Sequence, residues 1–391
     1  MNILILGNGF DLAHGLPTKY RDFLTFTNAF KDFYKDHGLT EDSSKDAERF
    51  TPYFEKLQWH HTSIYNELKC LIEKNVWLKH FNAVYEQRMQ YGKEGWIDFE
   101  SEISRSIQAL EGALKILKEY KKNGKGLGKI APDQFEDLRY LVNNLECKKN
   151  TILFLLEDLL EYKNIFLQDL NRLTRCLEIY LSDYINNLPI KKSLPDIKAL
   201  EIDKVLSFNY TNTYERLYGK DNSDIEYDYI HGKAKITNDI STCNLVLGID
   251  EYLVGDERNN NTEFIQFKKF FQRIYKKTGN KYVDWLKEFE KNVSKKRADL
   301  EPETLNIYIF GHSLDVTDKD ILRRLILGET GQISINNENI IHTIIFHYNQ
   351  NALGSQITNL VKVIGQDNLI SMVHGSDANI HLLTQRNAVE M

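Results

Sequence analysis

The feature that constrains this chain most is a short apolar run at its start, which passes directly into a glycine-rich turn. Residues 1–6 are Met-Asn-Ile-Leu-Ile-Leu, Gly7 follows at once, and Gly9 comes two positions later. This pattern predicts a β-strand, a tight turn and the N-terminus of a helix. Glycine allows a backbone to approach a phosphate closely, and a helix N-terminus offers N–H groups to an anion. We therefore predict a nucleotide-binding turn, with a plain strand–turn–helix as the alternative.

The spacing of the glycines differs from that of the common dinucleotide fingerprint. Dehydrogenases carry G-x-G-x-x-G, whereas Gly15 follows Gly7 by eight positions and precedes Leu16 and Pro17. The turn is therefore not of the dehydrogenase type. The residues predicted to contact the nucleotide are Gly7, Asn8, Gly9, Phe10, Asp11 and Gly15.

Further short apolar runs in the second half of the chain predict the remaining strands. They span residues 204–208, 227–230, 245–247, 306–310 and 341–346, and a helix is expected over 352–364. Several of these runs finish in Gly, Asn or His. Ligands bind at the carboxyl ends of the strands in a parallel α/β sheet, so these polar residues are expected to gather there. The sequence predicts an α/β fold with a Rossmann-like, mainly parallel sheet formed by residues 1–30 and 200–391.

The middle of the chain has a different periodicity. Apolar residues between positions 31 and 199 recur at spacings of three and four, which is typical of amphipathic helices. We expect a large helical insertion over 31–199 and a smaller helical insertion over 255–300 within the core.

Composition and charge exclude several classes of protein. The 391 residues are 42% hydrophobic and 12% aromatic with only 6 prolines, which is typical of a folded chain rather than a disordered one. The formal net charge of −6 gives no overall signal for nucleic-acid binding. The basic clusters at 268–277 and 291–297 are interpreted as solvated helix faces.

The 4 cysteines and the histidines give no metal-site spacing, and no metal is predicted. No Cys-x-x-Cys unit is present, and no apolar stretch reaches the ~20 residues of a membrane span. The apolar start is too short for a signal peptide and lacks a basic leader. A reducing cytoplasm is therefore the expected compartment.

Several polar motifs lie at the predicted strand ends and in one helix. They are Ser207-Phe-Asn-Tyr-Thr-Asn-Thr-Tyr-Glu215, His231-Gly232, Leu247-Gly-Ile-Asp250, Gly311-His-Ser-Leu-Asp-Val-Thr-Asp318 and Trp96-x-Asp98-x-Glu100. Together with the glycine turn, and in this order, they resemble the AbiH family of bacterial phage abortive-infection proteins over nearly the full chain.

The same motifs also resemble, more distantly, the sirtuin-like NAD-consuming enzymes. That pattern is G-A-G-x-S-x-x-x-G-I-P, then T-x-N-x-D, then H-G, then a G-x-S strand end. The matching positions in this chain are Gly7, Gly9, Gly15, Leu16, Pro17, Asn209, His231 and Gly232, and Glu215 falls where sirtuin-like defence enzymes often have glutamate.

The chain departs from the sirtuin pattern in three respects. Asp11 stands where sirtuins have serine, and Thr211 replaces the aspartate of T-x-N-x-D. The zinc-binding cysteines are missing, which argues against protein deacylation because that module frames the acyl-lysine groove. Bare NAD cleavage is less affected by this loss.

The chemistry of NAD cleavage suits two of these residues. Breaking the N-glycosidic bond requires a held pyrophosphate, a desolvated pocket and an acceptor or base near the ribose. Asn209 can orient the ribose or water without carrying charge, and His231 can accept a proton near neutral pH. Gly311 and Ser313 would complete the pocket.

Each site residue also has an ordinary structural interpretation. Asn209 can cap a helix that starts at Thr211, and His231 can be a turn histidine. Asp315 and Asp318 are expected to cap the following helix. A serine hydrolase is disfavoured, because Asp315 stands where G-x-S-x-G needs its second glycine. For Trp96, Asp98 and Glu100 we expect packing roles, with a carboxylate that lines the pocket as the alternative.

The resemblance implies an antiphage effector that binds and hydrolyses NAD or NADP to nicotinamide and ADP-ribose. The alternative is a module that binds the nucleotide without hydrolysing it and acts through a partner. A phage-encoded trigger or a second copy of the chain is an expected partner. A nuclease or RNA-directed toxin ranks last, because the chain has neither a basic surface signal nor a metal–carboxylate cluster.

Overall fold

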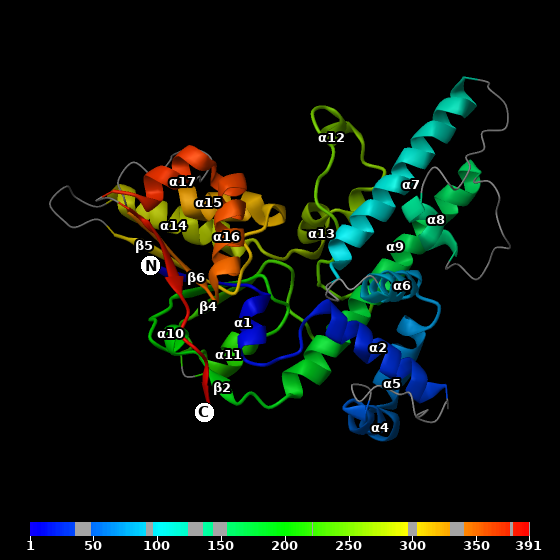
Figure 1. The fold of residues 1–391 in the computed structure, drawn as a ribbon, viewed down its shortest axis with the longest axis horizontal. Coiled ribbons are helices and arrows are strands. Elements are labelled where there is room, and N and C mark those ends of the chain that lie inside the picture. Colours follow the sequence, from blue (N-terminus) through cyan, green and yellow to red (C-terminus); the bar gives the residue numbers. More distant parts are fainter. Residues whose placement is uncertain are drawn as a thin grey trace. The chain divides into compact units, whose positions relative to one another are not determined.

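The chain divides into two compact units (Figure 1). The computed structural model describes residues 1–35, 48–90, 97–123, 136–143, 155–220, 222–295, 303–328, 340–375 and 378–390. The first unit comprises Met1–Thr18, Ile185–Lys233 and Lys277–Met391, and the second comprises Lys19–Tyr184 and Ala234–Lys276. Neither unit is one continuous stretch of sequence.

The first unit is built on a six-stranded sheet in which every neighbouring pair of strands is parallel. Its strands are β1 (Asn2–Leu6), β3 (Lys204–Ser207), β4 (Glu226–Tyr229), β5 (Leu305–Phe310), β6 (Ile341–His347) and β7 (Ile380–Thr384). The order across the sheet is β4-β3-β1-β5-β6-β7. Counted along the chain this is 3-2-1-4-5-6, the order of Rossmann folds. The predicted α/β fold with a mainly parallel sheet is confirmed.

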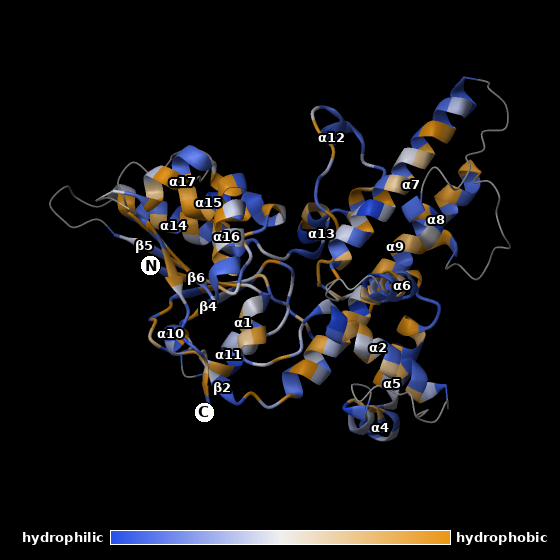
Figure 2. Ribbon diagram, viewed as in Figure 1, coloured by the Kyte–Doolittle hydropathy of each residue, from blue (hydrophilic) through white to orange (hydrophobic). Residues whose placement is uncertain are grey.

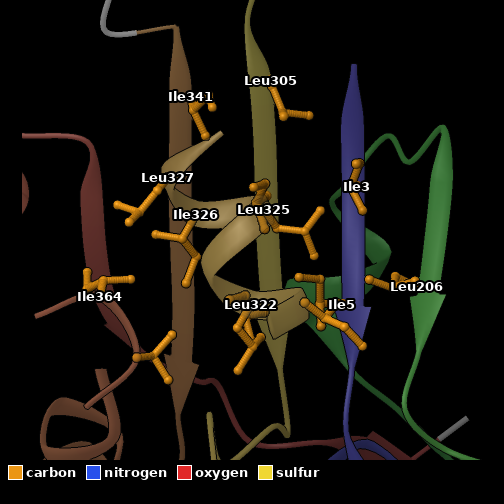
Figure 3. Packing of buried hydrophobic residues seen from close by; sticks show 14 of the residues in the cluster. Ile3, Ile5, Leu206, Leu305, Leu322, Leu325, Ile326, Leu327, Ile341 and Ile364 are labelled. Atoms are coloured by element: carbon orange, nitrogen blue, oxygen red, sulfur yellow. The ribbon is translucent and has the colours of Figure 1, made fainter. Parts of the chain in front are cut away.

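Helices cover both faces of this sheet, which explains why its central strands β1 and β5 are mostly apolar. Ile3 and Ile5 of β1 face a cluster formed with α14 (Lys281–Lys295), α15 (Lys319–Leu327), α16 (Gln350–Ile364) and α17 (Gln366–Val373). Figure 3 shows α15 packed over this face, with Leu322 and Leu325 near Ile5 and Leu305.

The opposite face of the sheet packs against shorter helices. Leu4 and Leu6 of β1 join a second cluster with α1 (Asn8–Ala13), α10 (Pro195–Lys198) and α11 (Thr213–Leu217). Alternate β1 side chains therefore enter two different cores. A small antiparallel pair, β2 (Lys192–Ser193) with β8 (Val389–Glu390), and short 3-10 turns at Ile185–Asn187 and Val316–Asp318 complete this unit.

The second unit is mainly helical. Its helices are α2 (Tyr20–Tyr34), α4 (Thr51–His60), α5 (Thr62–Ile72), α6 (Val76–Gln90), α7 (Phe99–Lys122), α8 (Glu136–Asn143), α9 (Leu156–Ile179), α12 (Glu257–Asn260) and α13 (Lys269–Lys276), with shorter turns at Tyr180–Tyr184 and Ile265–Phe267. Helices α5, α6 and α7 pack on α9. In Figure 2, α7 and α9 carry mixed apolar and polar residues, as expected of helices with one buried face.

A buried ion cluster fastens the segment after Ala234 to these helices. Arg175 of α9 pairs with Glu67 of α5 and with Glu178, each at 2.8 Å. Glu178 also accepts hydrogen bonds from the Asn238 side chain (2.6 Å) and the Lys235 N–H (3.2 Å). Because each buried charge has partners, the cluster avoids the penalty of an unpaired buried ion.

The strands predicted at 204–208, 227–230, 306–310 and 341–346 are confirmed to within one residue at each end. The strand predicted at 245–247 is wrong. Leu247 is buried, but its N–H and C=O are bound by the side-chain amide of Gln272 (3.1 Å each) rather than by a neighbouring strand. β7 was not expected, because it lies at the sheet edge with mostly exposed side chains. Among the described residues, no helix is long and apolar enough to cross a membrane.

Candidate functional site

The carboxyl ends of the parallel strands bring the predicted polar residues to one edge of the sheet. Leu6 pairs with Ser207 on one side and with Phe310 on the other, so these three strands end at the same level. The strand order reverses between β1 and β5, which is where Rossmann-like sheets open a ligand crevice. The glycine turn and the loop after β5 flank this point.

Backbone contacts between the two loops account for their glycines. A Cβ at Gly7 would lie 2.6 Å from the Gly311 carbonyl oxygen, and one at Gly9 would lie 2.7 Å from the Gly311 Cα. Gly7 N–H donates to the Phe310 carbonyl (3.1 Å), and Gly9 N–H donates to the Gly311 carbonyl (2.9 Å). Close packing thus requires glycine here, and both N–H groups are engaged within the protein. Contact of these glycines with a phosphate stays a prediction.

The other residues of the turn lie in different environments. The Phe10 side chain is buried among aromatic rings, including Phe310. Asn8 is exposed, and its Oδ1 accepts a hydrogen bond from the Thr18 hydroxyl (2.6 Å). Gly15 has a φ of +79°, a conformation that favours glycine, and no neighbour lies close to its missing side chain.

Asp11 is buried beside a small cavity of about 10 Å³, which has room for about one water molecule. Its Oδ2 accepts a hydrogen bond from the Thr211 hydroxyl (2.6 Å), whereas its Oδ1 has no hydrogen-bond partner within the described part of the chain. Burial raises the pKa of Asp11 from 3.8 to about 6, against the opposing effect of the Thr211 hydrogen bond. The two residues that depart from the sirtuin pattern are therefore in direct contact.

We expect Asp11 to make the folded protein less stable as the pH rises. Its folded pKa of about 6 lies above the ordinary 3.8, so the folded state holds this proton more tightly than the unfolded state. The contribution of Asp11 to the free energy of unfolding is fully present below pH 4 and is lost as the pH rises through the folded pKa of about 6. The loss amounts to about 3 kcal/mol.

Urea unfolding at pH 4.5 and pH 7.5, compared between the wild type and Asp11→Asn, checks this expectation. The free energy of unfolding of the wild type should fall relative to that of the variant between the two values. An equal pH dependence in both proteins would contradict the assignment to Asp11.

Asn209 ties β3 to the glycine turn. Its Nδ2 donates to the Gly7 carbonyl (3.0 Å), and its own N–H donates to the Ser207 hydroxyl (3.1 Å). The alternative in which Asn209 caps a helix starting at Thr211 is wrong, because α11 starts at Thr213 and its N-cap position is Asn212. The amide is thus held at the strand ends, against the turn.

His231 lies at the end of β4 and faces a carboxylate from the loop after β5. Its Nε2 is 3.6 Å from Asp318 Oδ1, and its ring is edge-on to Phe208 at a centroid distance of 5.7 Å. His231 Nδ1 is buried and has no hydrogen-bond partner among the residues that the structure describes. A buried lone pair without a donor costs about 1–3 kcal/mol, so this atom is a candidate contact for a ligand.

His312 approaches the same carboxylate from the other side. Its Nε2 is 3.5 Å from Asp318 Oδ2, and its Nδ1 accepts a hydrogen bond from Leu314 N–H (2.9 Å). Leu314 has a φ of +58° and Gly311 one of +68°, so the loop is tightly turned at two places. The hydrogen bond from Leu314 N–H to His312 helps to hold Leu314 in this left-handed backbone conformation, which a non-glycine residue rarely adopts.

Two further residues of this loop were assigned from sequence. Ser313 is exposed, and its carbonyl accepts a hydrogen bond from Asn359 (2.9 Å). Asp315 is confirmed as a cap, because its side chain accepts a hydrogen bond from Thr317 N–H (3.0 Å). For Asp318 the predicted cap is wrong: its side chain makes no capping bond to α15 and points at the two histidines instead.

The sequence interpretation missed the contribution of His312 and Asp318 to the site. The position of His312 between Gly311 and Ser313, directly after a strand, was a usable signal. Nothing local distinguishes Asp318 from a capping aspartate. Within the described ranges, no group of three or more His, Cys, Asp or Glu side chains is arranged to hold a metal ion.

The remaining predicted residues lie outside this cluster. Glu215 accepts hydrogen bonds from Tyr229 (2.8 Å) and from Lys233 (2.5 Å). In the second unit, Asp98 caps α7 by accepting a hydrogen bond from Glu100 N–H (3.0 Å), and Glu100 pairs with Lys269 (2.6 Å). Trp96 falls outside the described residues.

A family model described as "Bacteriophage abortive infection AbiH" matches residues 3–337. The matched range includes every residue of the candidate site, from Gly7 to Asp318. No curated protein and no solved structure matches the chain.

Proposed function

Because this chain belongs to the AbiH family of bacteriophage abortive-infection proteins, we propose that its Rossmann-like unit binds NAD or NADP and cleaves the N-glycosidic bond, releasing nicotinamide. The family assignment made from the sequence is confirmed by the match over residues 3–337. The nucleotide, its hydrolysis and the likeness to sirtuins are the proposed part. Loss of the cofactor would then arrest the infected cell.

The observation that carries the proposal is the environment of His231. A histidine at a strand end presents a buried Nδ1 without a partner while its other nitrogen faces a carboxylate. This arrangement suits a base that takes a proton from a ribose hydroxyl or from water. Few other side chains can accept a proton at neutral pH, so His231 is the residue on which the reaction would depend.

The charge of the site favours the ribose end of the nucleotide. The Asp318 carboxyl group lies beside His231. The Asp11 carboxyl group lies in the turn segment, where it contacts Thr211. Positive charge develops on the ribose as the glycosidic bond breaks, and nearby carboxylates stabilise such charge. Because Gly7 and Gly9 donate to carbonyls, polar contacts with the pyrophosphate would come from other groups, such as the exposed side chains of Asn8 and Ser313.

Asn209 would hold the ribose or the attacking water near His231. Its amide already bridges the end of β3 and the glycine turn.

The contact between Asp11 and Thr211 supports the likeness to NAD-consuming enzymes in one further respect. The sirtuin pattern has serine at the position of Asp11 and aspartate at the position of Thr211. In this chain the hydroxyl and carboxyl residues are exchanged between the two positions, and the two side chains are hydrogen-bonded at 2.6 Å.

A nucleotide sensor that does not hydrolyse its ligand is the second candidate. It is favoured by the burial of His231 Nδ1, because an enzyme needs this atom to reach the substrate and a sensor does not. Turnover would require a substrate to gain access to this buried atom. A sensor would need binding but no base.

We expect Asn209→Ala and His231→Ala to remove both antiphage protection and NAD depletion in infected cells. Phage plaque counts and cellular NAD measured through infection separate the two candidates, with exposed His381→Gln as the control. Protection that persists in both variants, or protection without any fall in NAD, would favour the sensor over the enzyme.

A further inference from the structure

Asp318 stands between two histidines that come from different strands. Its Oδ1 is 3.6 Å from His231 Nε2, and its Oδ2 is 3.5 Å from His312 Nε2. All three side chains are buried, with exposed fractions of 5–7%. The Phe208 ring lies against both imidazoles, at centroid distances of 5.7 Å and 4.4 Å. The two rings are therefore held on either side of one carboxylate.

The hydrogen bond from Leu314 fixes the tautomer of His312. Because His312 Nδ1 accepts the Leu314 N–H, that nitrogen carries no proton, and the neutral ring must carry its proton on Nε2. The protonated Nε2 then lies 3.5 Å from Asp318 Oδ2, a favourable charge contact. Two contacts, one on each nitrogen, therefore favour the same tautomer of His312.

His231 has only one such contact. Nothing within the described residues bonds to its Nδ1, and the Asp318 carboxylate lies 3.6 Å from its Nε2, so this carboxylate biases the ring through its charge rather than through a hydrogen bond. A carboxylate accepts and does not donate, which places the proton of neutral His231 on Nε2. The Nδ1 lone pair is left as the proton acceptor of the site.

We propose that Asp318 is a positioning residue that selects the Nε2–H tautomer of His231 and thereby makes Nδ1 the base, while the same carboxylate braces His312 and the turn at Leu314. The assignment of Nδ1 as the base rests on the proposed function. The tautomer selection does not, because it follows from the contacts alone.

The two histidines should respond differently when the carboxylate is removed. In Asp318→Asn the side-chain amide can donate to His231 Nε2, so His231 loses its single Nε2–H tautomer. His312 keeps its tautomer, because the Leu314 N–H still occupies its Nδ1. A general loss of structure would change both rings together, so this difference identifies positioning specifically.

Long-range ¹H–¹⁵N correlation spectra of histidine-labelled full-length protein read each tautomer directly. The His231 and His312 signals are assigned by their loss in His231→Gln and His312→Gln. Asp315→Asn is the matched control, because Asp315 lies on the same loop and caps the turn at Thr317. We expect Nε2–H for both rings in the wild type and in Asp315→Asn, and a change confined to His231 in Asp318→Asn.

A His231 ring with its proton on Nδ1 in the wild type would overturn the proposal. This measurement needs no variant, so the proposal can be tested even if Asp318→Asn fails to fold. An unchanged His231 tautomer in a folded Asp318→Asn protein would also overturn it. NAD turnover is measured in parallel, where kcat should fall by at least tenfold in Asp318→Asn with KM little changed. A wild type without turnover but with the expected tautomers would remove the proposed function and leave the positioning role standing.

Discussion

Gly311→Ala is expected to lower the stability of the folded protein strongly. Gly311 has a φ of +68°, and a Cβ at this position would lie 2.2 Å from the Phe10 backbone nitrogen. The left-handed conformation costs a non-glycine residue about 1–2 kcal/mol, and overpacking against backbone that cannot move aside adds about 1–3 kcal/mol. We expect the free energy of unfolding to fall by about 2–5 kcal/mol.

Urea unfolding followed by circular dichroism measures this loss, and Gly354→Ala provides the matched control. Gly354 lies inside α16, and a Cβ there would meet nothing within 4 Å. Alanine is a better helix former than glycine, so this variant should gain up to about 1 kcal/mol. Equal stabilities for the two variants would contradict the close packing of the Gly7 and Gly311 loops.

His231→Gln is expected to give the largest loss of catalysis. Glutamine keeps a polar side chain of similar length at the strand end but cannot act as a base at neutral pH. Removal of a general base lowers the rate by about 10²–10⁴-fold. We expect the loss in kcat, with KM little changed, because the residue acts on the proton rather than on ligand binding.

Steady-state release of nicotinamide from NAD measures this effect. His381→Gln is the control, because His381 is an exposed histidine of β7 in the same unit. A His231→Gln protein with wild-type kcat would show that another residue accepts the proton. A large loss in the His381 variant would show that the effect is not specific to the site.

The sheet could be predicted from the sequence where a strand is both apolar and followed by a turn residue. β1, β3 and β5 fulfil this rule as inner strands that end near Gly7, Asn209 and Gly311, and the edge strand β4, although partly exposed, ends near His231. The run at 245–247 fulfils it too, yet no strand forms there. Its backbone partner is the side chain of Gln272, and a pattern of apolar residues says nothing about partners.

The site was predicted in part, for a related reason. Asn209 and His231 stand directly after strands, so the parallel sheet brings them to the same edge. Asp318 was assigned to a helix cap, because the residue before a helix usually caps it. Its contact with His231 depends on how the loop after β5 approaches the end of β4. Such a contact between distant segments leaves no local trace in the sequence.

The glycines show a second limit. Gly7 and Gly9 carry the spacing of a nucleotide turn, and the same residues are required by the approach of Gly311. Packing and phosphate binding select the same residue type for the same physical reason, which is the absence of a Cβ. A glycine motif by itself therefore does not separate the two.

Cleavage of NAD at the site containing Asn209 and His231 is tested most directly with the purified protein. The protein is incubated with NAD, and separately with NADP, and the products are resolved by chromatography with His231→Ala in parallel. We expect nicotinamide and ADP-ribose (or its phosphorylated form) from the wild type and neither from the variant. Equal turnover by wild type and His231→Ala would contradict the assigned base, and the absence of both turnover and nucleotide binding in the wild type would contradict NAD cleavage itself.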